Sequence, residues 1–212
     1  IKKDDQLDYS NIEFKFPAEK GQLLANEFSR FNFIKSKKNL SANVPVLKKF
    51  IKINNTRKTI EKIREKVKIM IRKSKLIIPK NMKLEISYHY GLDNFYKTGL
   101  CMITQFNSGY CKKFLFLFPK QIHPTQFHKI KKESFFILMG KIQLIIDKRK
   151  YILKKGDMIT IQPKQKHFFK DISSSGSIIE EISSESIKSD SYYVDQKITK
   201  NKNRKSFISL NN

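Results

Sequence analysis

The sequence predicts a mainly β protein whose larger part is an antiparallel sandwich or barrel. From about Leu84 onward, short β-rich runs alternate with Gly, Pro, Asn, Asp or Lys turns, among them KLEISYHY, KKFLFLF, DMITIQP and SIIEEIS. Many short strands at nearly regular spacing are typical of this architecture. Upstream, only one segment has a clear helical pattern, and 212 residues are enough to bury a substantial core.

The helical segment begins after Asn55 or Thr56, either of which can cap its start. Its apolar positions recur at three- and four-residue spacing, as Ile60, Ile63, Val67 and Met70. This spacing predicts an amphipathic helix that ends near Ser74, before the extended run LIIPK.

Four segments are expected along the chain. Residues 1–50 alternate short apolar runs with turns, which predicts a few short strands in a small irregular unit. Residues 51–82 contain the linking helix, residues 83–198 the β domain, and residues 199–212 a mobile basic tail. The chain opens IKKDDQLDYS, without Met or a signal peptide, and we expect it to be part of a longer protein.

The charge of the chain is strongly positive, with Lys+Arg 44 against Asp+Glu 19. Only six of the basic residues are arginine, the residue best suited to bidentate phosphate and base contacts. The lysines are spread over the whole sequence. The helix and residues 200–205 are richer in basic residues, so contact with an anionic partner is an alternative there. We therefore expect solvated surface lysines and no specific nucleic-acid partner.

Hydropathy and cysteine content indicate the setting of the protein. No apolar run approaches the ~20 residues that a membrane helix needs, so no membrane partner is expected. Two cysteines in a chain of this length exclude a disulfide scaffold and suit a reducing compartment. We expect a cytoplasmic location.

Four side chains can form a metal site in the β domain. Gln126 and His128 lie two apart, so they share one face of a strand, and Glu133 opens the next strand. His167 follows a turn at Gly156. If they converge, these N and O ligands suit a divalent transition metal, Mn, Fe, Ni or Zn.

Two alternatives accompany this metal site. The same side chains can be hydrogen-bonded interior residues of a barrel without metal, although a buried Glu beside imidazoles is costly without a cation. His123 can also replace Gln126, but its odd spacing from His128 places it on the other face unless Pro124 bends the strand.

The segments QIHPTQFHKIKKESFFILMG and KGDMITIQPKQKH resemble the two motifs of the cupin superfamily. The resemblance implies a jelly-roll barrel. The first motif of that family ends His-x-His, three or four residues, Glu, six residues, Gly. The second reads Gly, five residues, Pro-x-Gly, two residues, His. The spacings 128–133–140 and 156–167 fit. Gln126 stands in place of the first His, and Pro163-Lys164-Gln165 replaces Pro-x-Gly, with Pro163 one place late.

A closer resemblance covers most of the chain. LEISYHYGLDNFYKTG, the first motif region and GSIIEEISSESIKSDSYYVD look like the cupin domain appended to some N-acetylneuraminate (sialic acid) synthase-like proteins. They resemble D-lyxose ketol-isomerases of the cupin class more distantly. IKKDDQLDYSNIEFKFP and FNFIKSKKNLSANVPVL are similar to the end of an antifreeze-like (SAF) domain, which implies a small α+β remnant before the cupin barrel.

The isomerase resemblance implies two catalytic candidates. Lys131 takes the position of a lysine beside the metal, where a cation and partial desolvation would lower its pKa; an exposed lysine is the alternative. Glu181 supplies a second carboxylate to the site if its side chain points inward; the alternative is that it forms an ion pair with a lysine. His89, Tyr90 and Tyr192 are candidates for binding a sugar, although strands of this kind often pack into a core.

Together these features predict a metal-binding cupin that handles a sugar or keto-sugar acid in nonulosonic (sialic) acid biosynthesis. It would be the C-terminal part of a synthase-like protein, and the resemblance implies sugar isomerase or epimerase activity. The alternative is a non-catalytic module that senses sugar or mediates dimerisation of that synthase. In either case we expect a homodimer.

Overall fold

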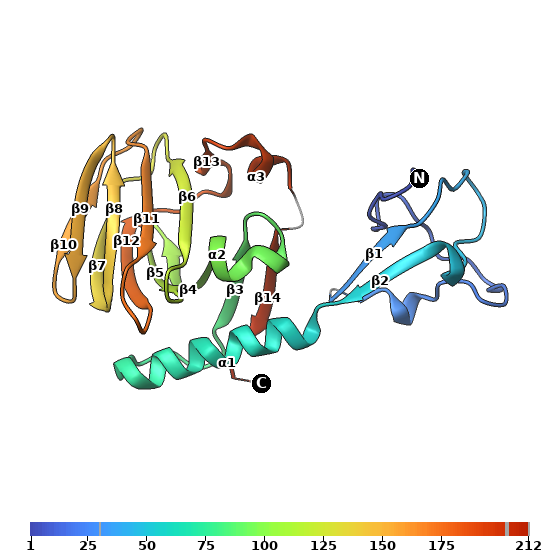
Figure 1. Cartoon of the computed structure of the whole chain (residues 1–212), viewed down its shortest axis with the longest axis horizontal. Coiled ribbons are helices and arrows are strands. Elements are labelled where there is room, and N and C mark those ends of the chain that lie inside the picture. Colours follow the sequence, from blue (N-terminus) through green and yellow to red (C-terminus); the bar gives the residue numbers. More distant parts are fainter. Residues whose placement is uncertain (30, 202–203, 212) are drawn as a thin grey trace. The chain divides into compact units, whose positions relative to one another are not determined.

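A computed structural model describes residues 1–29, 31–201 and 204–211. The chain forms two compact units, Ile1–Ile63 and Arg64–Asn212, whose elements are labelled in Figure 1. The boundary lies within the helix α1 (Arg57–Ser74). This helix confirms the predicted span, and the backbone N–H of Arg57 donates to the side chain of Asn55 at its start.

The first unit is built on two antiparallel strands, β1 (Asn32–Ser36) and β2 (Ile51–Asn55). Two short 3-10 helices, η1 (Ala25–Glu27) and η2 (Lys48–Phe50), lie in its connections. Its small core contains Leu7, Leu23, Ile34 and Ile51. Because β2 pairs with β1, the unit continues past residue 50, where we expected it to end.

The second unit contains two antiparallel sheets in its described part. The seven-stranded sheet has the order β10 (Met158–Ile161), β7 (Glu133–Met139), β12 (Ser177–Ser184), β5 (Tyr110–Leu117), β4 (Gly99–Ser108), β3 (Lys83–Tyr88) and β14 (Lys205–Ser209). The five-stranded sheet has the order β13 (Tyr192–Tyr193), β6 (Ile122–Phe127), β11 (His167–Asp171), β8 (Lys141–Ile146) and β9 (Arg149–Lys154).

The two sheets face each other and enclose the core, as Figure 1 shows. Alternate residues of each strand point inward, so apolar side chains of both sheets meet. The buried set includes Leu115, Phe135, Ile137, Leu144, Phe169 and Ile179. The fold is a mainly β jelly roll, which confirms the predicted fold class.

Short helices connect the strands of this unit. They are α2 (Phe95–Thr98), α3 (Gln196–Lys200), η3 (Leu92–Asn94) and η4 (Lys188–Asp190). The helix η4 precedes β13 and lies next to the segment that joins β6 to β7, as its hydrogen bonds to residues 128–131 show. This placement matters for the site described below.

The prediction of a mobile tail is wrong for residues 205–209. They form β14, which pairs with β3 through the register Lys205↔Ser87 to Ser209↔Lys83. Without β14, the backbone groups on that side of β3 would be unpaired at a sheet edge. Ile208 is buried, and Lys205 Nζ lies 2.5 Å from Oε1 of Glu85. The expected tail residues Lys202, Asn203 and Asn212 lie outside the described residues.

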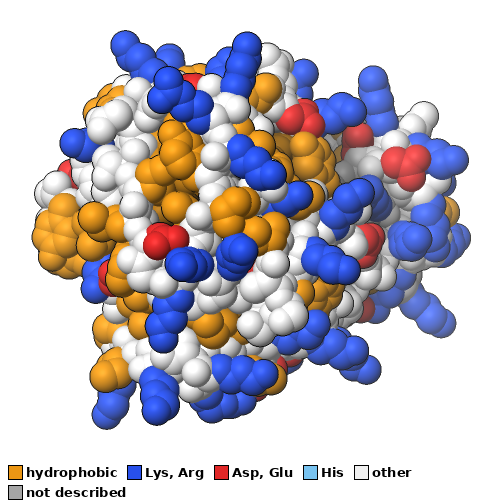
Figure 2. All heavy atoms as spheres, turned by 60° about the vertical axis from the view of Figure 1, so that its left-hand side comes forward, with side chains coloured by type: hydrophobic (Ala, Val, Ile, Leu, Met, Phe, Trp, Pro, Cys, Tyr) orange, Lys and Arg blue, Asp and Glu red, His pale blue; other side chains and the backbone are white. Residues whose placement is uncertain are grey.

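The surface agrees with the dispersed charge of the sequence. On the face shown in Figure 2, Lys and Arg side chains are spread among apolar and neutral ones and do not gather in one patch. Within the described residues, no helix has the length and apolar character needed to cross a membrane.

Candidate metal centre and its surroundings

Three strands of the second unit bring the predicted ligands together. His128 directly follows β6, Glu133 is the first residue of β7, and His167 is the first residue of β11. β6 and β11 are neighbours in one sheet, where Gln126 is the partner of His167, whereas β7 belongs to the other sheet. The site therefore bridges the two sheets inside the barrel.

His128, Glu133 and His167 form the ligand cluster. One ligand atom from each lies within 4.8 Å of the other two. His167 Nε2 is 3.0 Å from Glu133 Oε1, and His128 Nε2 is 3.8 Å from Glu133 Oε2. No side chain of the cluster is more than 6% exposed.

Hydrogen bonds to backbone carbonyls fix the tautomer of both rings. Nδ1 of His128 is 2.6 Å from the carbonyl oxygen of Asp190, and Nδ1 of His167 is 3.2 Å from that of Gln165. A carbonyl only accepts, so each Nδ1 carries the proton in the neutral ring. Both Nε2 atoms are then lone-pair acceptors, as ligands of a metal must be.

The chemistry of this donor set fits a cation. Two bare nitrogens and a carboxylate, all acceptors, converge at a buried point. His128 Nε2 has no hydrogen-bond partner among the described residues, and Glu133 Oε1 faces the lone pair of His167 Nε2 at 3.0 Å. Buried acceptors without donors are costly, and a divalent ion would satisfy all of them. Gln126 lies beside the cluster, with Nε2 3.2 Å from His167 Nε2.

Lys131 and Glu181 extend the cluster on the side of β12. Lys131 Nζ lies 2.5 Å from Glu133 Oε2 and 2.7 Å from Glu181 Oε1, and all three side chains are buried. Lys113 Nζ is 3.5 Å from the same oxygen of Glu181. The alternative of an exposed lysine is thus excluded for Lys131.

The expectation of a lowered pKa for Lys131 does not match this arrangement. Burial alone would lower the pKa, but the carboxylates of Glu181 and Glu133 raise it above its ordinary value. Burial would raise the pKa of Glu133, yet the ammonium group of Lys131 holds it below the usual range. From the sequence we expected a metal beside Lys131, whereas the charged groups that the structure places against its ammonium nitrogen are the carboxylates of Glu133 and Glu181.

The family comparison agrees with this geometry. Residues 115–176 match the family model described as the cupin domain. The matched stretch contains all three residues of the ligand cluster. The chain contains a cupin domain.

Known proteins resemble the chain beyond this stretch. It is 27% identical over 172 residues to a D-lyxose ketol-isomerase of Thermofilum sp. (strain ex4484_79), which covers 68% of this chain and 95% of that protein. The L-ribose isomerase of Cellulomonas parahominis, solved with L-psicose, has a TM-score of 0.56 at 13% identity and covers 68% of this chain and 94% of its own.

A second L-ribose isomerase, an Acinetobacter sp. DL28 variant in complex with L-ribose, has a TM-score of 0.58 at 12% identity. This match covers 67% of this chain and 93% of the other. At such identities the two structures show a shared fold. These comparisons give no support to the predicted link with a sialic acid synthase or an SAF domain.

The backbone conformation explains why two positions of the cupin motifs favour glycine. Gly140 has φ 82°, and a Cβ there would collide with the carbonyl oxygen of Gly176 and with Ser177. Counted from Gly156, the glycine of the second motif falls at Lys164, which still adopts φ 69°. Its N–H donates to the carbonyl of His128 at 2.5 Å. The departure at Lys164 therefore leaves the turn before His167 attached to the ligand cluster.

Each of the predicted sugar-binding residues contacts a side chain or backbone group of the second unit. His89 is buried, with Nδ1 3.0 Å from the carbonyl of Thr98 and Nε2 3.2 Å from the hydroxyl of Tyr193. The hydroxyl of Tyr90 donates to Asp195. Tyr192 stacks on Phe127 with ring centroids 5.2 Å apart. Since neighbours on a strand face opposite sides, Tyr193 and not Tyr192 faces His89.

His123 is in the interior, because the pairing of β6 with β11 is irregular between His123 and Gln126. Between Gln126↔His167 and His123↔Phe169, the register shifts, so three positions of β6 span two of β11. His123 stacks on Phe169 at 4.6 Å and is 2% exposed. Burial lowers its pKa, which keeps the ring neutral. It is not part of the ligand cluster.

The residues selected from the sequence do not include two that lie near the site, Tyr193 and Asp190. Asp190 is buried and accepts from the backbone N–H groups of the segment between β6 and β7. No local pattern in the sequence distinguishes it from other acidic residues, because its partners lie about 60 positions away.

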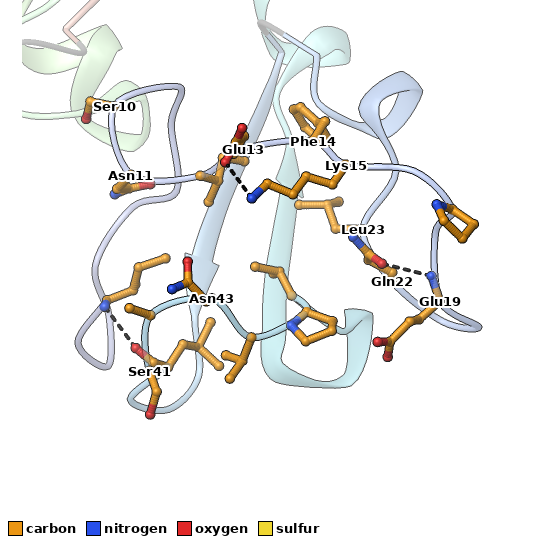
Figure 3. A pocket seen from close by; sticks show the side chains of 18 residues that line it. Ser10, Asn11, Glu13, Phe14, Lys15, Glu19, Gln22, Leu23, Ser41 and Asn43 are labelled. Atoms are coloured by element: carbon orange, nitrogen blue, oxygen red, sulfur yellow. Dashed lines mark hydrogen bonds and ion pairs between the residues drawn. The ribbon is translucent and has the colours of Figure 1, made fainter.

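The first unit has a pocket of its own, of about 730 Å³, shown in Figure 3. An ion pair between Glu13 and Lys15 at 3.2 Å lies on its rim, with both side chains largely exposed. Neutral polar and apolar side chains such as Asn11, Phe14 and Leu23 make up most of the rest. None of the predicted site residues lines this pocket.

Proposed function

We propose that the cupin domain is a metal-dependent sugar isomerase that interconverts an aldose and its ketose. The observation that carries this proposal is the placement of Lys131 and Glu181 beside the ligand cluster. A carboxylate base, an ammonium group and a cation site thereby share one buried region. The relative named D-lyxose ketol-isomerase supports this assignment, and the fold shared with L-ribose isomerases agrees with it.

Isomerisation of an aldose moves the proton of C2 to C1 and one hydroxyl proton from O2 to O1. The carboxylate of Glu181 would take the proton from C2 and return it to C1. The ammonium group of Lys131 would hold the sugar oxygens by hydrogen bonds and exchange the hydroxyl proton. A divalent ion held by His128, Glu133 and His167 would polarise the carbonyl and hydroxyl oxygens.

The experiment is an isomerisation assay with neighbouring glutamates as matched variants. Protein loaded with Mn²⁺ or Zn²⁺ is incubated with D-lyxose and with L-ribose, and ketose formation is followed by NMR. We expect Glu181→Gln to reduce kcat by at least about 100-fold. Glu180→Gln should retain activity, because Glu180 pairs with Lys112 at 2.8 Å instead. Equal activity of the two variants would contradict the role of Glu181.

A narrower proposal concerns the biosynthesis of nonulosonic acids. Resemblance of the sequence to the cupin part of sialic acid synthase-like proteins is its only support, and it would make the substrate a sugar or keto-sugar acid. Including sialic acid and its neutral amino-sugar precursors in the same assay tests it. Turnover of pentoses alone would reject this proposal and leave the isomerase assignment intact. The cytoplasmic location belongs to this proposal as well.

A second candidate is a non-catalytic module that senses sugar or mediates dimerisation of a larger synthase-like protein. The observation in its favour is Gln126, an amide where cupins of the resembling family have a histidine ligand. Calorimetry with the same sugars distinguishes the two, since binding without any ketose formation would favour the module. Light scattering tests the proposed homodimer, and a mass of 25.1 kDa in solution would reject it.

A further inference from the structure

Asp190 contacts four consecutive residues that connect β6 to β7. Its backbone carbonyl accepts from Nδ1 of His128 at 2.6 Å. Its carboxylate accepts from the backbone N–H of Lys129 at 2.8 Å, of Ile130 at 3.2 Å and of Lys131 at 2.9 Å. Asp190 is 4% exposed, and its bonds to His128 and Lys131 are buried, whereas those to Lys129 and Ile130 are partly buried.

This segment needs such a partner. The pairing of β6 ends at Phe127 and that of β7 starts at Glu133, so residues 128–132 have no strand ladder to satisfy their N–H groups. A carboxylate that accepts several N–H groups in succession replaces the ladder and fixes the backbone. The residues fixed in this way begin with a cluster histidine and end with the lysine that bridges Glu133 and Glu181.

We propose that Asp190 is a positioning residue that sets the places of His128 and Lys131 together. Through its carbonyl, it holds the His128 ring with Nε2 directed at the cluster. Through its carboxylate, it holds the backbone of Lys131, from which Nζ reaches both Glu133 and Glu181. The catalytic consequence of this placement rests on the proposed isomerase function, whereas the structural one does not.

Asp190→Asn separates the two contacts. Any residue at this position retains the backbone carbonyl that accepts from His128. The side-chain amide of the asparagine, however, places an NH₂ donor near the backbone N–H donors and has no negative charge. The variant therefore loosens residues 129–131 without changing a side chain of the ligand cluster. Asp157→Asn is the matched control, because Asp157 accepts the backbone N–H of Lys154 in a different turn of the same domain.

Hydrogen exchange of the full chain tests the structural part. In the wild type, amides of residues 129–131 should be protected although they lie outside a strand. We expect Asp190→Asn to speed their exchange by at least about tenfold, with little change in β4 and β5. If the amides of residues 129–131 in the wild type exchange as fast as those of exposed loops, this result alone overturns the proposal. Uniform acceleration across the domain would also overturn it, since it indicates a general loss of stability.

Kinetics of the metal-loaded protein test the consequence for catalysis. We expect Asp190→Asn to lower kcat by about 10- to 100-fold with KM changed less than about threefold, and Asp157→Asn to leave both unchanged. A rise in KM alone would contradict a role in positioning Lys131. If the wild type isomerises no sugar, the proposed function fails, and the exchange experiment still decides whether Asp190 positions the segment.

Discussion

The ammonium nitrogen of Lys131 lies 2.5 Å from Oε2 of Glu133, and both side chains are buried. Since Glu181 approaches the same nitrogen at 2.7 Å, one cation is shared by two carboxylates. Buried charges of this kind are tolerated only while their partners are present. The stability of the domain, the proposed metal binding and the proposed proton transfer therefore depend on the same few atoms.

Removal of the shared cation should destabilise the metal-free protein. Lys131→Met leaves Glu133 and Glu181 buried near each other without their bridging charge, and we expect a loss of about 3–5 kcal/mol in the free energy of unfolding. Urea denaturation in EDTA measures it. Lys132→Met, at an exposed neighbour, should change the value by no more than about 0.5 kcal/mol. Equal stability of both variants would mean that the buried ion pairs are not needed.

Metal uptake should depend on the cluster histidines and not on His123. His128→Ala and His167→Ala each remove one of two nitrogen ligands, so we expect substoichiometric Zn²⁺ or Mn²⁺ after equilibration and gel filtration. His123→Gln should retain stoichiometric metal, because His123 stacks on Phe169 and is not part of the cluster. Elemental analysis gives the result. Loss of metal in the His123 variant alone would identify a different ligand set.

The Gln126→His substitution should strengthen metal binding. Gln126 lies next to His167 at the edge of the cluster, and an imidazole is a better ligand than an amide for Zn, Ni or Fe. We expect an affinity gain of at least about tenfold in a chelator competition assay. Unchanged affinity would show that position 126 does not reach the ion. Thr125→His, one residue earlier on the same strand, should give no gain, since it faces the other side.

Acidification should destabilise the folded protein through His89. Burial lowers the pKa of His89 to about 4, whereas an unfolded histidine has a pKa of about 6.5. Between these values the unfolded chain binds the proton more tightly, so stability falls as the pH decreases. We expect a loss of about 2 kcal/mol between pH 7.5 and pH 5 from this residue.

Urea denaturation of metal-free protein at the two pH values measures this loss. His89→Gln should make the decrease smaller by about the same amount, because the glutamine does not titrate. Other buried histidines contribute to the remaining pH dependence. A variant with the full wild-type decrease would show that His89 is protonated in the folded state as readily as in the unfolded chain.

Periodic patterns in the sequence predicted the fold well. The apolar spacing gave α1, and the alternating runs after Leu84 gave the strands of the second unit. The basic composition of the last residues, in contrast, led us to predict a mobile tail. In the structure, Lys205–Ser209 pairs with a strand more than a hundred positions earlier. Pairing with β3 depends on an open sheet edge, which local composition does not reveal.

For the site, motif spacing was sufficient to find His128, Glu133 and His167 and the structure places them together. It was not sufficient for the surroundings. We had chosen Tyr192 as a sugar-binding candidate, but Tyr193 is the residue that faces the interior. Adjacent residues of a strand point to opposite faces of the sheet, so an error of one position reverses the prediction. The bulge in β6 that brings His123 inside is a property of the pairing between β6 and β11.

The sequence by itself determined the alternation of strands, the start and end of the main helix and the set of residues able to ligate a metal. These depend on the periodicity of neighbours along the chain and on side-chain chemistry. Only the tertiary structure decided that Lys131 lies between two carboxylates and that Asp190 holds the segment before Glu133. The charge state and position of a buried group depend on atoms that folding brings near it from distant parts of the chain.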